Sequence, residues 1–346
     1  MSNIVLTSTC NLKCPYCFAN EFVNRSNTEI TFENYLKAKD FLTKYGEKVI
    51  GLIGGEPLLH SRFKDIVRDV IYDTRIEKCT IYTNGINCDK FLDVFSSSKI
   101  RFLVNCNSPE DIGHRNYKRL CDNLDEMILN RYMGNRMSLG INMYKENANY
   151  DYIINLLKKY NFRHLRVSIT VPNNDSEKNY NSVEYFRKMK PSVVSFFHAL
   201  DDCGIIPHYD CNKMPSCVLT DEERKFMKHL FDKIPPEMRR KNEDVDTVIC
   251  RPVIDILQDL TAIRCFGLSE VSKVPISDFE NAKDLHEYYL REFDAYAHNT
   301  ASCSECAGCN SRKVAKCTGG CLSYKINDIN EMRKKSDSLI SAHLEG

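Results

Sequence analysis

The feature that most constrains the fold is an alternation of short apolar runs with segments of helical period over about the first two hundred residues. The apolar runs lie at 2–8, 48–53, 78–83, 100–105, 137–143 and 164–171. The helix-period segments lie near 31–44, 61–74, 88–98, 110–133, 148–160 and 180–202. Short apolar runs separated by amphipathic helices indicate βαβ units and a parallel sheet. These repeats fall short of the eight that close a full barrel, so we expect a partial barrel or an open wound sheet, with the ligand site at the carboxyl ends of the strands.

The pattern changes after Gly204, and we divide the chain into four parts. Residues 1–203 form the α/β part, and 204–244 form a bridging region that starts with prolines and polar turn residues. Within that region 220–234 is predicted to be a helix, with Thr220 as its N-cap and Glu223 three residues later. The part 245–325 holds seven cysteines in short segments, and 326–346 is a polar C-terminal helix or tail.

The chain has 17 cysteines in 346 residues, which indicates either a disulfide framework or metal ligation. Its N-terminus lacks the basic and apolar regions of a signal peptide, and an odd number of cysteines does not suit complete pairing. We therefore expect a cytoplasmic protein with reduced thiols. Lys and Arg number 48 against 47 Asp and Glu, which disfavours nucleic-acid and membrane-surface partners. No apolar run approaches the ~18 residues that span a bilayer.

The first cysteine cluster lies in the loop after the first strand. Cys10, Cys14 and Cys17 form a C-x3-C-x2-C pattern. Three thiolates within eight residues can hold three corners of one metal cluster and leave a fourth corner open to a small molecule. The alternative is a zinc knuckle with a distant fourth ligand, because structural zinc sites normally have four ligands.

This spacing resembles that of the radical S-adenosylmethionine (radical SAM) enzymes. The resemblance implies that the three cysteines hold a 4Fe–4S cluster and that SAM chelates the fourth iron. It also implies that an electron from the cluster cleaves SAM to methionine and a 5′-deoxyadenosyl radical, which abstracts hydrogen from a substrate. Tyr16, directly before the third cysteine, matches the aromatic residue that packs near the adenine.

Further motifs of the family follow at the ends of successive strands. The second strand ends in Gly54, Gly55, Glu56 and Pro57. This segment resembles the GGEP of radical SAM enzymes, whose backbone and Glu hold the SAM amino group. Glycines also let a backbone approach a ligand closely. Taken alone, the four residues could equally form an ordinary βα turn.

Three single residues continue the comparison along the sheet. Asn84 lies in a T-N-G segment after the third strand, which resembles the family. Asn105 ends the fourth strand, where many relatives carry Ser and Asp on the ribose of SAM. Arg166 lies on the sixth strand, where relatives often place a basic partner for the SAM carboxylate. The alternative for Arg166 is a solvated arginine at the strand edge.

A second cysteine cluster lies near the C-terminus. Five cysteines fall within nineteen residues, namely Cys303, Cys306, Cys309, Cys317 and Cys321. Cys250 and Cys265 precede them in a stretch that favours two short strands around a turn. Seven thiols exceed one tetrahedral site, so two clusters are expected. The alternative is a pair of structural zinc ions.

The C-terminal pattern resembles the SPASM extension of radical SAM enzymes. By that resemblance Cys250, Cys265 and Cys321 ligate a first auxiliary 4Fe–4S cluster. A second auxiliary cluster would take Cys306, Cys309 and Cys317. The sequence departs from the pattern because no cysteine follows Cys321, and we expect Cys303 to serve instead as the last ligand of the second site.

The fourth ligand of the first auxiliary cluster is left open by the sequence. Cys203, Cys211 and Cys217 are candidates, and the fourth position could also be open for substrate. Cys211 and Cys217 could be incidental thiols, cluster ligands or, in a catalytic role for Cys217, a hydrogen-atom donor that quenches a substrate radical.

Together these features predict an α/β chain with a partial (β/α)6 radical SAM barrel followed by a small cysteine-rich SPASM-like iron–sulfur domain. The resemblance implies a ribosomally made precursor peptide or protein as substrate, modified by cross-linking, thioether formation, oxidation or epimerisation. It also implies an external electron donor of the flavodoxin or ferredoxin type. Because the first strand starts at residue 4, we expect leader recognition by another surface or a separate leader-binding protein. The alternatives are a protein modifier like the sulfatase-maturating enzymes, a small-molecule radical SAM dehydrogenase and a zinc-stapled binding module without catalysis.

Overall fold

A computed structural model describes residues 2–171, 181–236, 244–329, 331 and 334 of the chain. Six strands form where the apolar runs predict them, and each is parallel to the next. They are β1 (Ser2–Val5), β2 (Val49–Ile53), β3 (Lys78–Thr83), β4 (Ile100–Asn105), β5 (Met137–Met143) and β6 (His164–Ile169). The βαβ prediction is therefore confirmed for this part of the chain.

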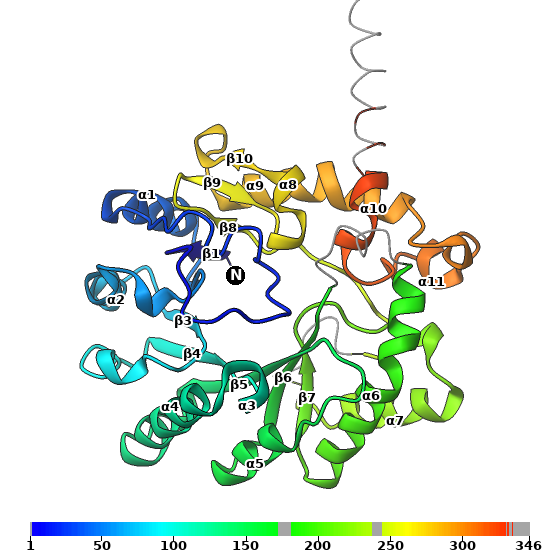
Figure 1. The fold of residues 1–346 in the computed structure, drawn as a ribbon. Helices are drawn as coiled ribbons and strands as arrows, with labels where there is room; N and C mark the ends of the chain where they lie inside the picture. The colour runs from blue at the N-terminus through cyan, green and yellow to red at the C-terminus, as the bar shows by residue number, and fades with distance from the viewer. Residues whose placement is uncertain (1, 172–180, 237–243, 330, 332–333, 335–346) are drawn as a thin grey trace, which may run out of the picture.

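Helices cover the outer face of this curved sheet (Figure 1). They include α1 (Phe32–Thr43), α2 (Phe63–Tyr72), α3 (Pro109–Ile112), α4 (His114–Leu124), α5 (Asp151–Lys159) and α6 (Ser182–Asp202). The helix expected at 88–98 is wrong, because only the 3-10 turn η2 (Cys88–Phe91) forms there. Arg136 donates instead to the carbonyls of Phe95 and Ile100, at 2.8 and 3.2 Å, so this backbone is held by a side chain outside the segment.

The two faces of the strands differ in polarity. Along β4 the side chains of Ile100, Phe102 and Val104 are buried in the core. Arg101 and Asn105 alternate with them and are only partly buried. Since successive strand residues point to opposite faces, one face packs on the helices and the other lines the inside of the curved sheet (Figure 1). The inner face of β4 is thus partly accessible and carries Arg101 and Asn105 beside Leu103, whereas the outer face is apolar and buried.

The sheet is larger than six strands. β7 (Ile206–Tyr209) adds to β6 in parallel, inside the region expected to be a bridge, and β8 (Asp255–Ile256) adds to β1 in parallel. β9 (Thr261–Ile263) and β10 (Val274–Pro275) then follow in antiparallel fashion. The order is β10-β9-β8-β1-β2-β3-β4-β5-β6-β7. β7 has four residues and contains Pro207, which explains why its sequence reads as a loop. The hairpin predicted between Cys250 and Cys265 is confirmed.

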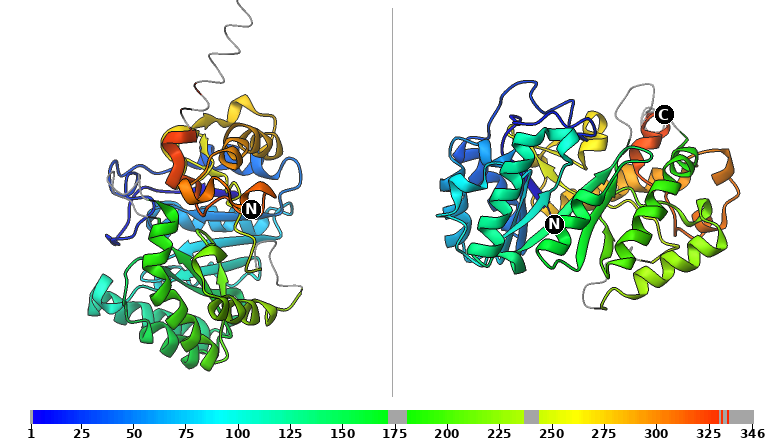
Figure 2. Two further views of the ribbon diagram at one scale, coloured as in Figure 1. Left: turned by 90° about the vertical axis from the view of Figure 1, so that its right-hand side faces the viewer. Right: turned by 60° about the horizontal axis from the view of Figure 1, so that its bottom comes forward.

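The remaining described helices belong mostly to the cysteine-rich C-terminal part. They are α7 (Asp221–Asp232), α8 (Ser269–Ser272), α9 (Ala282–Tyr289), α10 (Ala295–Asn299) and α11 (Asn310–Lys313). Figures 1 and 2 show that this part, in orange and red, lies between the hairpin side of the sheet and the helices beyond β7. Arg187 on α6 pairs with Glu305 at 2.6 Å, and the Phe186 ring lies 6.1 Å from that of Tyr324. The cysteine-rich part therefore packs directly against α6.

Two smaller expectations have different outcomes. The N-cap predicted at Thr220 is confirmed, because Thr220 Oγ1 accepts from the Glu223 amide at 3.2 Å and Glu223 accepts from the Thr220 amide at 2.7 Å. Most of the predicted tail 326–346 lies outside the described residues. Across the described ranges, no helix combines the length and the apolar character needed to cross a membrane.

Candidate functional site

The cysteine loop leaves β1 and is fixed to the end of β2 by its own backbone. Gly55 N donates to Thr7 O at 2.7 Å and Glu56 N donates to Thr9 O at 2.8 Å. A Cβ on Gly54 would lie 2.5 Å from Thr7 O, and one on Gly55 would lie 2.3 Å from Thr9 O. Because the two glycines have no side chains, the cysteine loop can pack directly against this turn. The contact fixes the backbone of the loop directly before Cys10.

Each thiol of the first cluster accepts a hydrogen bond. Leu12 N donates to Cys10 Sγ at 3.4 Å, and Asn107 Nδ2 donates to Cys14 Sγ at 3.8 Å. The amide of Ala19 donates to Cys17. Burial raises the pKa of Cys10 to about 12 and that of Cys14 to about 11, so an electropositive group is needed to hold them as thiolates.

This donor set fits a 4Fe–4S cluster. Thiolate is the usual ligand of such clusters, and hydrogen bonds to the sulfurs tune their potential. The three cysteines are only partly buried. Figure 1 shows the dark blue loop after β1 lying across the inside of the curved sheet.

Glu56 is a fully buried carboxylate at the centre of the site. Its Oε1 accepts from Thr83 Oγ1 at 2.8 Å and from Leu58 N at 3.3 Å, and its Oε2 accepts from Asn84 N at 2.8 Å. Burial raises the pKa of Glu56 to about 7, and these three donors oppose the rise. Glu56 therefore ties the end of β2 to the end of β3, and Pro57, the first residue of the turn η1 (Pro57–Leu59), continues the chain from it.

A chain of polar contacts connects the cysteine loop with the far strands. Asn105 Nδ2 donates to Tyr16 Oη at 3.0 Å, and Asn142 Nδ2 donates to Asn105 Oδ1 at 3.2 Å. Arg166 Nη1 donates to Asn142 Oδ1 at 2.7 Å, and Arg166 Nε donates to Asp210 Oδ2 at 2.9 Å. Tyr16, Asn105 and Arg166 thus lie in one network over β4 to β7. The alternative of a solvated Arg166 is wrong, since only 15% of its side chain is exposed.

Sequence reasoning missed four members of this site. They are Asn11, which accepts from Asn84 Nδ2 at 2.8 Å, and Asn107, Asn142 and Asp210. Asp210 directly follows the end of β7, and Asn107 lies two residues after the end of β4, where parallel sheets place ligand-binding residues. That position is the signal that could have found them.

The C-terminal cysteines form two neighbourhoods. In the first, the thiol of Cys321 contacts that of Cys250. Arg264 Nη1 lies 3.6 Å from Cys250 Sγ and 3.9 Å from Cys265 Sγ. Residues 248–250 are held there by a parallel bridge between Val248 and Cys317. The three cysteines expected in the first auxiliary site therefore gather around one arginine.

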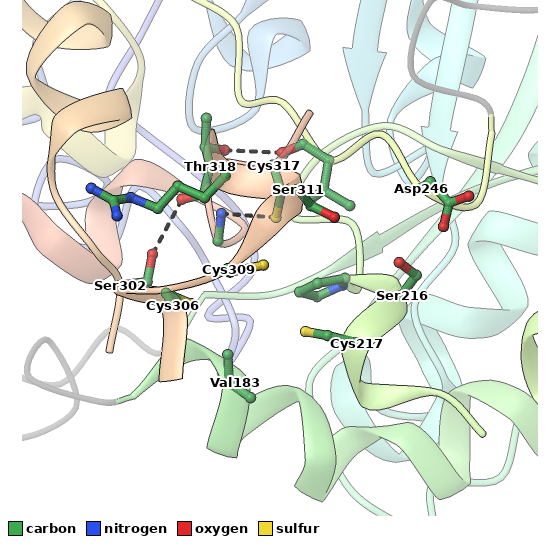
Figure 3. Close-up of a pocket in the computed structure, with 14 residues that line it drawn as sticks. Val183, Ser216, Cys217, Asp246, Ser302, Cys306, Cys309, Ser311, Cys317 and Thr318 are labelled. Carbon is green, nitrogen blue, oxygen red and sulfur yellow. Dashed lines mark hydrogen bonds between the residues drawn. The ribbon is translucent and has the colours of Figure 1, made fainter. Parts of the chain in front are cut away.

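The second neighbourhood surrounds a pocket (Figure 3). Cys306, Cys309 and Cys317 line it, and Cys217 lines it from the opposite side. Gly319 N donates to Cys317 Sγ at 3.2 Å. Cys303 is not among the lining residues of this pocket, although its Sγ lies 3.5 Å from Cys306 Sγ.

Within the described part of the chain, no three His, Cys, Asp or Glu side chains are grouped so that they could hold one metal ion.

Comparisons with known proteins agree with this geometry. Residues 4–128 match the model of the radical SAM superfamily. A GTP 3′,8-cyclase from Synechocystis sp. is 32% identical over 121 residues, which are 33% of this chain and 36% of the relative. The chain thus spans about a third of that relative's length. A probable GTP 3′,8-cyclase from Methanococcus aeolicus is 22% identical over 305 residues, covering 84% of this chain and 93% of the relative.

Solved structures extend the likeness to most of the chain. Streptococcus suis SuiB bound to S-adenosylmethionine has a TM-score of 0.59 at 16% identity and covers 93% of this chain and 72% of SuiB. Native anSMEcpe with bound AdoMet has a TM-score of 0.61 at 14% identity, over 93% and 89%. These likenesses show a shared fold. The chain contains a radical SAM superfamily domain within an α/β fold whose parallel sheet is typical of that superfamily. The superfamily match over residues 4–128 and the similarity to GTP 3′,8-cyclases indicate an enzyme.

Proposed function

We propose that the protein cleaves SAM reductively and uses the resulting 5′-deoxyadenosyl radical to abstract hydrogen from a peptide or protein side chain. The observation that carries the proposal is the placement of Cys10, Cys14 and Cys17 in one loop across the mouth of the barrel, fixed to the Gly54–Gly55 turn. When bound by these cysteines, a 4Fe–4S cluster would supply the electron that breaks the S–C5′ bond of SAM. The electron would come from a flavodoxin- or ferredoxin-type donor.

The residues of this chain have separate tasks in that reaction. Asn84 and Glu56 hold the ends of β2 and β3 together under the cysteine loop. Tyr16 is buried and keeps its ring 4.9 Å from that of Tyr144, so the two rings offer an aromatic surface beside the cluster loop. Arg166 presents a cation inside the sheet, balanced by Asp210. We assign Tyr16 to the adenine of SAM and Arg166 to its carboxylate.

A peptide substrate is supported by the extent of the structural likeness. The match to SuiB covers 93% of this chain, so it includes the cysteine-rich part, and SuiB has also been solved bound to the precursor peptide SuiA. We propose the same substrate class here, with the C-terminal thiols in a SPASM-like domain that holds two auxiliary 4Fe–4S clusters. A separate leader-binding protein and a cytoplasmic location belong to the same proposal. A sulfatase-maturase-like protein modification would use the same site.

A nucleotide substrate is the second candidate, because the M. aeolicus relative that matches over 93% of its length is a probable GTP 3′,8-cyclase. Several of the other cyclase matches cover 82 to 161 residues, a length that suits the SAM-binding part more than the whole enzyme. A further cation near the site, Lys145, is already paired with Asp111 at 3.3 Å. A triphosphate would have to compete with this carboxylate.

The test measures 5′-deoxyadenosine by chromatography after anaerobic reconstitution with iron and sulfide. Reduced protein is supplied with SAM and either GTP or a deuterated synthetic peptide. We expect 5′-deoxyadenosine that carries deuterium from the peptide, and none from a Cys14→Ala variant. Stimulation by GTP without deuterium transfer from the peptide would establish the second candidate. Absence of 5′-deoxyadenosine in all samples that contain iron would refute the radical mechanism.

A further inference from the structure

The segment between β7 and the turn η5 (Ser216–Val218) carries two cysteines that the SPASM resemblance leaves without a role. We propose that Cys211 and Cys217 are each the fourth protein ligand of an auxiliary iron–sulfur cluster. Cys211 joins Cys250, Cys265 and Cys321, and Cys217 joins Cys306, Cys309 and Cys317. The inference rests on the proposed function, because it assumes that these sites bind iron–sulfur clusters.

Cys211 lies at the first set of thiols. The Cys321 thiol makes side-chain contacts with both Cys211 and Cys250. The neighbouring residue Asn212 fixes this arrangement, because its Oδ1 accepts from Cys321 N at 3.1 Å and its Nδ2 donates to Tyr324 Oη at 3.1 Å. Asn212 is buried. The segment is therefore attached to the Cys321 turn by contacts that do not depend on a metal.

A buried arginine marks this set as a place for negative charge. Arg264 is completely buried and pairs with Asp294 through Nε at 2.8 Å and Nη2 at 2.6 Å. Its Nη1 remains directed at Cys250 Sγ and Cys265 Sγ. The Arg–Asp pair is neutral by itself, so the third nitrogen is available to donate charge-assisted hydrogen bonds to thiolate sulfur. A protonated thiol accepts only a weak hydrogen bond from the Arg264 guanidinium, whereas an iron-bound thiolate accepts a strong one.

Cys217 lies at the second set. It lines the same pocket as Cys306, Cys309 and Cys317, and Figure 3 shows its sulfur turned toward the space that Cys309 also faces. Four cysteines thus surround one pocket. Cys303 does not line the pocket, although its Sγ lies 3.5 Å from Cys306 Sγ, so we assign the fourth position to Cys217 in place of the Cys303 expected from the sequence.

Cys203 provides a contrast within the same region of sequence. Val183, at the start of α6, lines the pocket, whereas Cys203 follows the end of that helix. A helix of 21 residues is about 30 Å long, at 1.5 Å per residue. Cys203 is therefore too far away to ligate either cluster, and it serves as the matched control.

The first experiment needs no substitution. Cys211 and Cys217 are the two exposed cysteines of the chain, so iodoacetamide should reach and alkylate both in iron-free protein. After anaerobic reconstitution we expect alkylation of both to slow by at least about tenfold, because iron-bound thiolate is not free to react. Alkylation of Cys203 should stay unchanged. Mass spectrometry of tryptic peptides gives each rate. Unslowed alkylation of Cys211 and Cys217 in protein that holds all three clusters would overturn the proposal.

A second experiment uses iron content in a Cys10→Ala/Cys14→Ala/Cys17→Ala background. That background should retain about eight irons in two auxiliary clusters. Adding Cys211→Ala or Cys217→Ala should lower the count by about one to four irons and produce a three-iron paramagnetic signal, which a general folding defect would not give. Cys203→Ala and Cys303→Ala should keep the parent value. Iron that is unchanged in the Cys211 and Cys217 variants refutes this ligand assignment alone, whereas a background without any iron refutes the auxiliary clusters themselves.

Discussion

Glu56 makes the stability of this protein depend on pH in a predictable direction. Its carboxyl is fully buried, and burial raises its pKa from the ordinary 4.5 to about 7. A group whose pKa is higher in the folded state favours folding below its unfolded pKa, and that contribution is lost as the pH rises through the folded value. A shift of about 2.5 units at 1.36 kcal/mol per unit corresponds to about 3 kcal/mol, lost between pH 4.5 and pH 8.

The variant Glu56→Gln removes the titrating group and should flatten the pH dependence of unfolding by about 3 kcal/mol over that range. Gln has one side-chain oxygen fewer than Glu, so the hydrogen bond from Asn84 N to Oε2 is lost. This loss lowers the free energy of unfolding at every pH but does not change its slope with pH. Urea unfolding is measured at several pH values in protein of matched iron content. The exposed Glu33→Gln should keep the wild-type slope.

Asp255 provides a second control for the same reasoning. It is fully buried, and burial raises its pKa to about 7 against the hydrogen bond from Asn3 Nδ2 at 2.7 Å. Asp255→Asn should therefore flatten the slope in the same direction. If Asp255→Asn flattens the slope and Glu56→Gln leaves it at the wild-type value, Glu56 does not titrate as a buried acid and the reasoning is refuted.

Three further substitutions test other parts of the structure. Gly55→Ala places a Cβ 2.3 Å from Thr9 O, so the cysteine loop must move. We expect loss of 5′-deoxyadenosine formation while the iron of the auxiliary clusters remains. Unchanged formation of 5′-deoxyadenosine would contradict this packing. Arg264→Met should destabilise the protein by about 3–5 kcal/mol in urea unfolding because Asp294 is left buried and unpaired. The double variant with Asp294→Leu should recover much of that loss, and an additive loss would argue against the pair. Thr220→Ala removes the N-cap of α7 and should cost about 1 kcal/mol, with iron content unchanged.

Much of the fold could be predicted because local sequence and global packing agree over the first six strands. Each apolar run lies in a parallel sheet against helices, so its hydrophobicity reflects its burial. β7 could not be predicted from its four residues because Pro207 disfavours a strand. The segment forms a strand by pairing with the edge of β6. The pairing of β8 with β1 could not be predicted either, because it joins residues about 250 positions apart in sequence.

The residues of the site also differ in whether the local sequence could predict their positions. The proximity of Cys10, Cys14 and Cys17 could be predicted because the three residues lie within eight consecutive positions. The role of Glu56 could not be read from its motif, because its donors Thr83 and Asn84 come from the next strand and depend on the register of the sheet. The same holds for Arg166, whose pairing with Asp210 exists only because β7 extends the sheet.

The pairing of β1 with β8 has a consequence for how the protein is made. Asn3 and Asp255 are joined by a side-chain hydrogen bond although 252 residues separate them. At about 5–20 residues per second on the ribosome, the first strand waits roughly 13–50 seconds for its outer neighbour. During that time one edge of β1 has no partner, while β2 can already cover the other. The nascent chain must therefore keep β1 soluble until β8 has been made, which makes translation speed and chaperone availability natural controls on the yield of folded protein.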